Sequence, residues 1–462
     1  MFRLQTPKRI TFITRWIAGA SLALLALSVL SVRSTQTTFS TAFAQPAGDT
    51  NGDVVINVSG PTRTKYPIAI PLATTGDTKT AKMIQSVASF DMGVAGWFRL
   101  LGASDMPSSV ASEGTTLDID AWKEVGVFAV LKYRSVVSGG RLSITFKLYE
   151  IEKGDKPVLE KSYRGAKSDA RLFTHKFCNA MVQYFTGEPG FFGSKITFAS
   201  KGRGASKRIV AMDFDGFKPY SVSRNRYVNI LPAFSPDGSR IAYTSYMRDN
   251  PDLYVASAGG GRPKRLSKRY GMNTGATWSP DGSRIALTLS KDGNPEIYII
   301  NASSGKIISR LTRNRHIDTS PSWSPDGKEI AFVSDRQGSP QIFVVSARGG
   351  AAKRVSKNGS YNTTPSWAPI SGKRLLAYTT SAGGHFDIVT LNLASGAMTR
   401  ITQNEGNNEE PTWAPNGRAI AFASSRKGGT GIYIVNADGT GDAVLVYRGS
   451  ATSVDWGPAP AQ

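Results

Sequence analysis

The clearest feature of the chain is a pattern of apolar and polar positions that returns about every 45 residues after residue 190. Each unit contains a short segment that ends in an aromatic residue, a Pro-containing tight turn and a second, largely apolar segment. The turn prolines stand 44, 45, 44 and 46 residues apart, at Pro236, Pro280, Pro325, Pro369 and Pro415. A period of this length with four strand-like segments per unit is typical of a β-propeller with one blade per repeat.

Four strands can be identified within each unit. The first ends in an aromatic residue such as Trp278 or Trp323, and a turn of the type Ser-Pro-Asp-Gly follows it. Proline fixes φ in this turn, and Asp and Gly accept the tighter conformations that come next. A second apolar segment (330–333 in one unit), a third (297–300 in another) and a short basic fourth (309–312) complete the unit. The short basic segment is typical of an exposed outer edge.

The number of blades follows from the two ends of the repeat region. The second strand recurs six times, beginning at Lys195, Arg240, Arg284, Glu329, Arg374 and Ala419. The first of these has no aromatic-ended strand before it, whereas residues 453–458 form a strand-like segment with no partner. We therefore predict that this C-terminal segment pairs beside residues 195–200 and closes a ring of six blades, which removes two exposed sheet edges.

Residues 45–190 carry no repeat and predict an α/β domain. Apolar patterns predict strands at 54–58, 68–72, 125–132, 142–151 and 158–163. Helical spacing predicts helices at 78–98 and 168–186, the second capped by Ser168 and ended by Gly187. The expected organisation is an N-terminal α/β domain at 45–190, a six-bladed propeller at 191–458 and a tail at 459–462.

Residues 1–44 have the pattern of a secretory signal peptide. A basic start precedes an apolar stretch, and Ala42-Phe43-Ala44 offers the small-x-small cleavage pattern. The signal predicts export, to the periplasm or to the outside of the cell. The polar stretch at 33–41 is long for the region before a cleavage site, so an uncleaved membrane anchor remains an alternative.

The composition adds a strong positive charge. The formal net charge is +22, and the single cysteine, Cys178, excludes an intrachain disulfide. Such a charge favours an anionic partner, namely nucleic acid, anionic lipid or an acidic protein face, or it reflects a solvated basic surface. Nucleic-acid binding conflicts with the predicted export.

Catalytic motifs are absent from the sequence. It contains no Gly-x-Ser-x-Gly, no Walker loop, no His-Glu-x-x-His and no Cys-x-x-Cys, and its three histidines lie in different predicted elements. His175 and Cys178 stand one helical turn apart, but no second ligand pair accompanies them, which favours a structural role. We expect a protein that is not an enzyme. The alternative is an exported propeller enzyme that acts on peptide or glycan in its channel.

One set of polar residues recurs at a fixed place in the repeats. Five residues before the inner-strand aromatic stands an Asn or Asp: Asn229, Asn273, Asp318, Asn362 and Asn408, with Ala451 in the sixth unit. The next positions are mostly Thr or Glu, and include Thr274, Thr319, Thr363 and Glu409. Because inner strands line a propeller channel, these residues are expected to ring one mouth. Such a ring can bind a peptide or hold a hard cation through oxygen ligands, or each Asn makes only a local turn.

The stretches outside the repeats carry a family resemblance. They are Pro67-Ile68-Ala69-Ile70-Pro71, Gly96-Trp97-Phe98-Arg99, Trp122-Lys123-Glu124-Val125-Gly126, the segment 169–176 with 184–188, and the propeller start at 195–200. With these motifs the chain from residue 45 onward resembles the TolB family, the periplasmic propeller proteins of the Tol–Pal cell-envelope system.

This resemblance implies a non-enzymatic periplasmic scaffold without a cofactor, although a cation in the channel is possible. Such a scaffold links inner-membrane Tol proteins to Pal, the peptidoglycan-associated lipoprotein, and maintains outer-membrane integrity and envelope constriction during division. The resemblance places Pal at the propeller mouth, at positions that include Asn229, Asn273, Asn362 and Asn408, and TolA at the mature N-terminus, residues 45–52. It also implies a monomer, peripheral to membranes, that does not bind nucleic acid.

Overall fold

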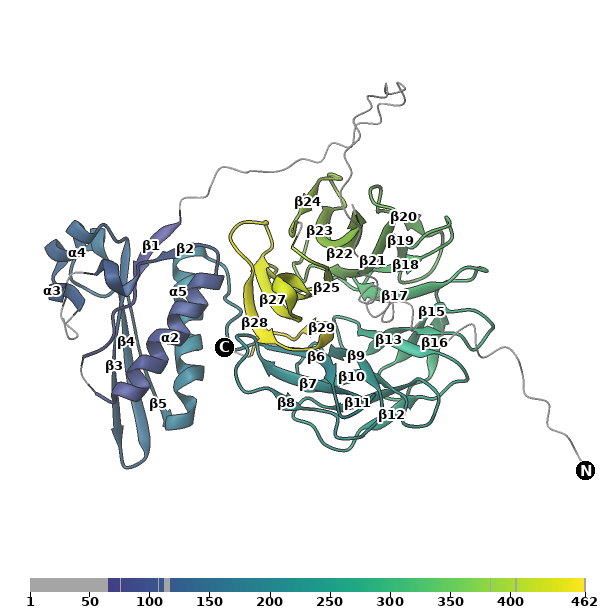
Figure 1. Ribbon diagram of the computed structural model, residues 1–462, viewed down its shortest axis with the longest axis horizontal. Helices are drawn as coiled ribbons and strands as arrows, with labels where there is room; N and C mark the ends of the chain where they lie inside the picture. Colours follow the sequence, from purple (N-terminus) through teal and green to yellow (C-terminus); the bar gives the residue numbers. More distant parts are fainter. Residues whose placement is uncertain are drawn as a thin grey trace, which may run out of the picture. The chain divides into compact units, whose positions relative to one another are not determined.

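The computed structural model describes residues 65–460, apart from residues 75, 107, 112–116, 383 and 404. Within this part of the chain, a five-stranded sheet with its helices is followed by six four-stranded sheets (Figure 1). The predicted signal peptide, the mature N-terminus and the strand expected at 54–58 lie outside the described residues. No helix formed by the described residues has the length and apolar character needed to span a bilayer.

The N-terminal sheet is a mixed sheet with strand order β2-β1-β3-β4-β5. β1 pairs in parallel with β2 and β3, and the other pairs are antiparallel. Its strands are β1 (Tyr66–Ala69), β2 (Phe98–Leu100), β3 (Ala129–Ser138), β4 (Arg141–Glu150) and β5 (Leu159–Ala166). The helices are α2 (Thr78–Val94), α3 (Ser108–Ala111), α4 (Ile119–Val125) and α5 (Ala170–Thr186), and α2 and α5 lie side by side in Figure 1.

The two long helices differ from the sequence-based expectation at their ends. α2 stops at Val94 rather than at Phe98, because Gly96 adopts φ 79° and Phe98 enters β2. The predicted cap Ser168 lies in a short 3-10 turn, Lys167–Asp169, and α5 begins after it. Gly187, with φ 71°, ends α5 as predicted, since glycine adopts this left-handed conformation without strain.

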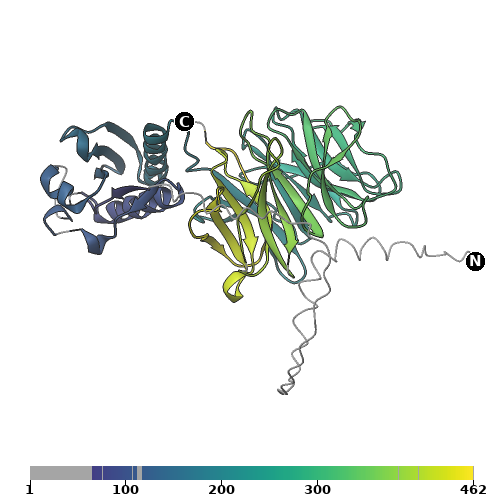
Figure 2. The same ribbon diagram turned by 90° about the horizontal axis from the view of Figure 1, so that it is seen from above.

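The six remaining sheets are the blades of the predicted propeller, and Figure 2 shows them packed one against the next. The first blade contains β29 (Ala451–Trp456), β6 (Lys195–Lys201), β7 (Lys207–Asp213) and β8 (Tyr220–Ser221). The second and third contain β9 (Asn229–Phe234), β10 (Arg240–Ser245), β11 (Asp252–Ser257), β12 (Lys264–Ser267), β13 (Asn273–Trp278), β14 (Arg284–Leu289), β15 (Glu296–Asn301) and β16 (Ile307–Arg310). The fourth, fifth and sixth contain β17 (Asp318–Trp323), β18 (Glu329–Ser334), β19 (Gln341–Ser346), β20 (Lys353–Arg354), β21 (Tyr361–Trp367), β22 (Leu375–Ala382), β23 (His385–Asn392), β24 (Met398–Arg400), β25 (Asn408–Trp413), β26 (Ala419–Ser424), β27 (Gly431–Asn436) and β28 (Val444–Arg448).

The predicted closure of the ring is confirmed by the pairing of β29 with β6. The strands are antiparallel, with Ala451 opposite Ser200 and Trp456 opposite Ile196. The first blade therefore takes its innermost strand from the C-terminal part of the chain, and the propeller has six blades.

The aromatic residue at the end of each innermost strand connects neighbouring blades. The indole N–H of Trp278 donates to the carbonyl oxygen of Ala233 in the preceding blade at 3.1 Å. The guanidinium of Arg240, also in the preceding blade, lies over the Trp278 ring at 4.6 Å from its centroid. Trp278 packs in the same buried cluster as Leu253 of that blade. The aromatic that marks the sequence repeat thus contributes contacts between blades as well as within its own.

A bulge interrupts every innermost strand near its start, at the third residue of five strands and at the fourth residue of β21. This residue adopts positive φ, between 49° and 61°, in all six blades: Leu231, Gly275, Ser320, Thr364, Glu410 and Ser453. The pairing register of each innermost strand shifts at the same place. Five of the six residues are not glycine, so their left-handed conformation has a local cost in free energy, and the surrounding blade holds them in it. A bulge re-aims the side chains around it, and here it does so next to the channel.

A buried group of charges joins α2 and α5 to the first blade. His175 Nδ1 lies 2.7 Å from Asp91 Oδ2 on α2, and His175 Nε2 lies 3.7 Å from Asp215 Oδ2, after β7. Arg171, one turn before His175, also forms an ion pair with Asp215. Burial raises the pKa of Asp91 to about 6. Burial alone lowers the pKa of His175, but the nearby Asp91 carboxylate outweighs it and the pKa is raised. His175 and Cys178 therefore have the structural setting that the sequence favoured.

Candidate partner-binding site at the propeller mouth

Strand directions define one end of the channel. Asn229, the first residue of β9, pairs with Ser245, the last of β10, which pairs with Asp252, the first of β11. The loops that lead into the innermost strands therefore lie at the same end as the loops that join second to third strands. We call this end the mouth. Its entry loops are 222–228, 268–272, 311–317, 355–360, 401–407 and 449–450.

The five Asn and Asp residues that the sequence singled out are the first or second residues of their innermost strands, and each is 0% exposed: Asn229, Asn273, Asp318, Asn362 and Asn408. Their side chains bond to the entry loops. Asn273 Nδ2 donates to the carbonyl oxygens of Arg269 at 2.7 Å and Gly271 at 3.0 Å. Asn229 Nδ2 likewise donates to Tyr227 O at 2.9 Å. These hydrogen bonds give a donor to loop carbonyl oxygens that have no partner in a β-strand.

Some of these side chains also link one blade to the preceding one. Asn362 Nδ2 donates to Gln341 Oε1 at 2.8 Å, and Asn408 Nδ2 donates to Asp387 Oδ1 at 3.2 Å. Gln341 begins the third strand of the fourth blade, while Asn362 belongs to the fifth. Asp387 and Asn408 bridge the fifth and sixth blades in the same way.

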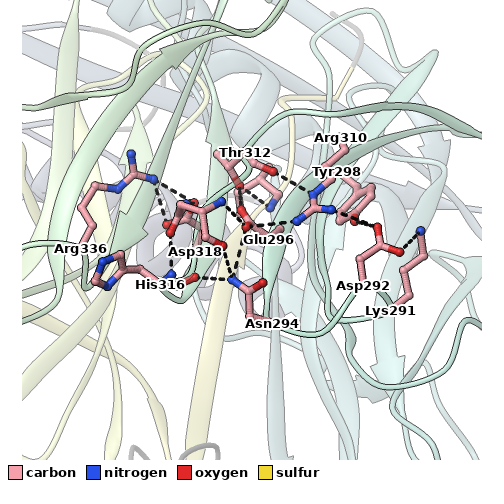
Figure 3. A network of polar contacts seen from close by, with 12 residues as sticks. Lys291, Asp292, Asn294, Glu296, Tyr298, Arg310, Thr312, His316, Asp318 and Arg336 are labelled. Atoms are coloured by element: carbon pink, nitrogen blue, oxygen red, sulfur yellow. Dashed lines mark hydrogen bonds and ion pairs between the residues drawn. The ribbon is translucent and has the colours of Figure 1, made fainter.

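Figure 3 shows the corresponding network between the third and fourth blades. Glu296, the first residue of β15, accepts hydrogen bonds from Thr312 Oγ1 at 2.5 Å and from the Asn314 N–H at 2.7 Å. Asn314 Nδ2 in turn donates to Asp318 Oδ2 at 2.7 Å, and Arg336 pairs with the same carboxylate at 2.9 Å. Buried carboxylates thus have cationic and polar partners, as their burial requires. The network fixes the entry loop between the two blades.

The structure therefore places the predicted ring residues in two groups. The Asn and Asp side chains are buried and form hydrogen bonds to the entry loops and to neighbouring blades. This agrees with the alternative in which each Asn makes a local turn, and it adds contacts between blades. Of the second positions, Thr319, Thr363 and Glu409 are half-buried, while Thr274 is only 5% exposed. Ala451 has no polar side chain for such bonds and is 6% exposed. The side chains that approach solvent at the mouth come from the second positions and not from the first.

Two further carboxyl groups on the innermost strands, those of Glu410 and Asp455, were missed by sequence reasoning. Burial, and then the charge of Glu410, raises the pKa of Glu409 to about 7. Burial also raises the pKa of Glu410, although the N–H of Ser453 donates to its carboxylate. Burial raises the pKa of Asp455 to about 7, although the N–H of Phe234 donates to Oδ2 at 2.8 Å. The available signal was that acids occupy strand positions where the other repeats have uncharged residues, mostly Ser, Thr or Gly.

The donor groups do not make a metal site in the described part of the chain. No three His, Cys, Asp or Glu side chains there are gathered closely enough to hold an ion. Chemically, the mouth offers hydroxyl groups, the Glu409 carboxyl group with its pKa raised to about 7, and fixed loops.

Comparison with known proteins identifies the family. The model of the TolB beta propeller domain matches residues 182–459, and that of the TolB amino-terminal domain matches residues 54–156. The Tol-Pal system protein TolB of Desulfosudis oleivorans is 38% identical over 208 residues, which cover 43% of this chain and 47% of that protein. The TolB of Geobacter sulfurreducens is 38% identical over 165 residues, 36% of this chain and 38% of that protein. The chain thus matches less than half the length of these curated relatives.

A solved structure shows the same fold over a larger extent. The crystal structure of TolB from Acinetobacter baumannii has a TM-score of 0.74 and 24% sequence identity, and the match covers 86% of this chain and 97% of that one. The propeller match alone spans more than half of the sequence. The chain therefore belongs to the TolB family.

Proposed function

We propose that this protein is a non-enzymatic periplasmic scaffold of the Tol–Pal system, which holds the Pal lipoprotein at the propeller mouth and contacts TolA through its mature N-terminus. The observation that supports the proposal is that the loops of the mouth are already held in place by the protein itself. In five of the six blades, a buried Asn or Asp fixes an entry loop before any partner arrives. Loops ordered in advance lower the entropic cost of binding. The Tol-Pal system is proposed because the relatives are named as Tol-Pal system proteins.

In this proposal the predicted site residues have two roles. Asn229, Asn273, Asp318, Asn362 and Asn408 position the loops, and the second positions touch the partner. Thr319, Thr363 and Glu409 are half-buried and approach solvent, whereas Thr274 supports its strand from a buried place.

The Pal contact is tested by placing a bulky charge at the mouth and, as a control, at the opposite end of the channel. Thr363→Arg alters a half-buried second position, and Ser283→Arg alters an exposed residue of the turn between β13 and β14. We expect Thr363→Arg to lower retention of the purified Pal domain at least about tenfold and Ser283→Arg to leave it unchanged. Equal retention by both variants, at equal thermal stability, contradicts a mouth site for Pal.

The cellular role is tested by deletion and trimming. Loss of the protein is expected to cause leakage of periplasmic contents and sensitivity to detergent. Removal of residues 45–53, which lie outside the described part of the chain, is expected to abolish capture of TolA and to leave capture of Pal in place. The scaffold proposal is wrong if the purified protein turns over a peptide or glycan with saturation kinetics and the deletion strain keeps a normal envelope. The enzyme alternative then takes its place.

A further inference from the structure

The charge of the mouth is unevenly distributed around the channel. The entry loops of the second to fifth blades contain seven Lys and Arg residues and no Asp or Glu: Arg224, Arg226, Lys268, Arg269, Arg313, Arg315 and Lys357. We call these four loops the basic sector. The entry loop of the sixth blade contains Glu405 instead, and that of the first blade has no charged residue. The excess of positive charge in the sequence is therefore concentrated, at this end, on four consecutive blades.

The cations of the basic sector are available to a partner. All except Arg269 are exposed, and those six form no ion pair with any residue in the described ranges. Arg269 is held within the structure, where it donates to the Gly305 carbonyl oxygen at 2.8 Å. Unpaired cations placed close together repel one another, so an arrangement of this kind gains free energy when an anionic group approaches.

Exposed aromatic rings stand among these cations. Tyr270 is 85% exposed and Tyr227 is 49% exposed, and each follows an arginine in its own entry loop. A large exposed side chain of this type is costly to leave in water, and tyrosine is enriched at the centre of protein interfaces because its ring packs while its hydroxyl bonds. Tyr270 and Tyr227 supply apolar contact next to the charges.

The opposite side of the mouth carries acidic groups. Glu409 and Glu410 lie on β25, and Glu405 in the preceding loop pairs with Arg426 at 2.6 Å. The entry loops are thus basic and aromatic over four blades, whereas the innermost strand of the sixth carries carboxyl groups. In the loops that join second to third strands at the same end, Asp249, Asp292 and Asp335 each stand next to a Lys or Arg. A folded protein can match both signs, so the distribution favours a polypeptide partner.

We infer that the basic sector binds an acidic polypeptide segment of the partner, with Tyr270 packed against an apolar residue beside the acidic groups. This inference rests on the proposed function, because it names the chemistry of the partner surface that the mouth receives. The sector sets the orientation of the partner around the channel axis and accelerates its approach, since long-range attraction acts before contact.

The test compares two variants with the same change in net charge. The mouth variant combines Arg224→Ala, Arg226→Ala, Lys268→Ala and Arg313→Ala. The control variant combines Arg262→Ala, Lys306→Ala, Lys328→Ala and Lys353→Ala, all exposed and outside the mouth loops. The probes are the soluble Pal domain, a labelled Asp- and Glu-rich peptide containing one Phe, the same peptide with Lys in place of its acids, and vesicles containing phosphatidylglycerol.

We expect the mouth variant to bind the acidic peptide and Pal about tenfold more weakly at low salt, with a flatter dependence on salt, and the control variant to behave as the wild type. Tyr270→Ala is expected to weaken binding equally at low and high salt. If all variants bind Pal and the peptide alike, the inference is wrong while the proposed function stands. If the wild type binds the acidic peptide but not Pal, the inference stands and the proposed partner fails. Loss of vesicle binding alone in the mouth variant overturns the inference in favour of a membrane surface.

Discussion

The indole N–H of Trp456 donates a hydrogen bond to Ser194 Oγ at 2.8 Å. Ser194 immediately precedes the first propeller strand, β6, whereas Trp456 ends the last, β29. Trp456 also packs edge-on against Phe191, in the segment between α5 and β6, with ring centroids 5.4 Å apart. One residue thus closes the ring and contacts the segment that connects the propeller to the N-terminal domain.

Replacement of Trp456 by Ala is expected to lower the free energy of unfolding by about 3–5 kcal/mol, because a large buried ring and its hydrogen bond are lost together. The measurement is urea unfolding followed by circular dichroism. Removal of residues 459–462, beyond β29, serves as the control and is expected to leave the transition unchanged. A wild-type transition for Trp456→Ala contradicts the assigned role in ring closure.

Replacement of Asn408 by Ala is expected to cost about 1–3 kcal/mol, because buried partners such as Asp387 and the Ser424 hydroxyl lose a hydrogen bond. Arg313→Ala, in an exposed entry loop, is the control and is expected to stay within about 0.5 kcal/mol of the wild type. Thermal unfolding of the two variants decides whether the bonds across blades stabilise the ring.

The carboxyl group of Asp455 predicts a pH dependence of stability. Its pKa in the folded protein is about 7, above the ordinary value of 3.8, so the folded state binds more protons than the unfolded state between these values. Stability is therefore expected to fall as the pH rises from about 4 to about 7. Asp455→Asn keeps an acceptor for the Phe234 N–H and is expected to flatten this dependence. Urea midpoints across this range test it, and an unchanged slope in the variant rules out Asp455 as the titrating group.

His175→Phe is expected to retain the ring contact with Phe214 but to remove the cation between Asp91 and Asp215. Because buried carboxylates then lose their partner, the free energy of unfolding is expected to fall by about 3 kcal/mol. The raised pKa of His175 means that its contribution is complete below the ordinary value near 6.5 and is lost as the pH rises through the folded value. Because Asp91, with its pKa of about 6, is ionised only above that value, the loss in the variant is expected to be largest from about pH 6 up to the raised pKa of His175, and adding Asp91→Asn is expected to restore part of it. Equal losses at all pH values contradict a protonated His175.

The sequence predicted the ring and its closure because every blade repeats one set of local patterns. The spacing of the turn prolines indicated a propeller, the six recurrences of the second strand indicated six blades, and the unpaired segment 453–458 implied the pairing with β6. The end of α2 was placed too late because the apolar pattern continues through Trp97 and Phe98, where Phe98 already belongs to β2. A helical period does not distinguish these positions when a glycine turn, here at Gly96, separates them.

The site was only partly predictable, for a different reason. The register of Asn408 and its equivalents was visible in the repeat, but the direction of their side chains depends on the bulge and on partners in another blade. The raised pKa values of Glu409 and Asp455 come from burial between strands that lie far apart in sequence. Short-range patterns carry information about strand and turn, but not about which side chains a neighbouring blade covers.

The pairing of β29 with β6 determines the order in which the chain can assemble. As the polypeptide grows from its N-terminus, blades two to six each receive their own four strands in succession. β6 keeps one edge unpaired throughout, because its partner is the last strand to be synthesised. The ring therefore closes only when its final strand has been made, and a nascent chain that ends before β29 leaves the inner edge of the first blade without a partner.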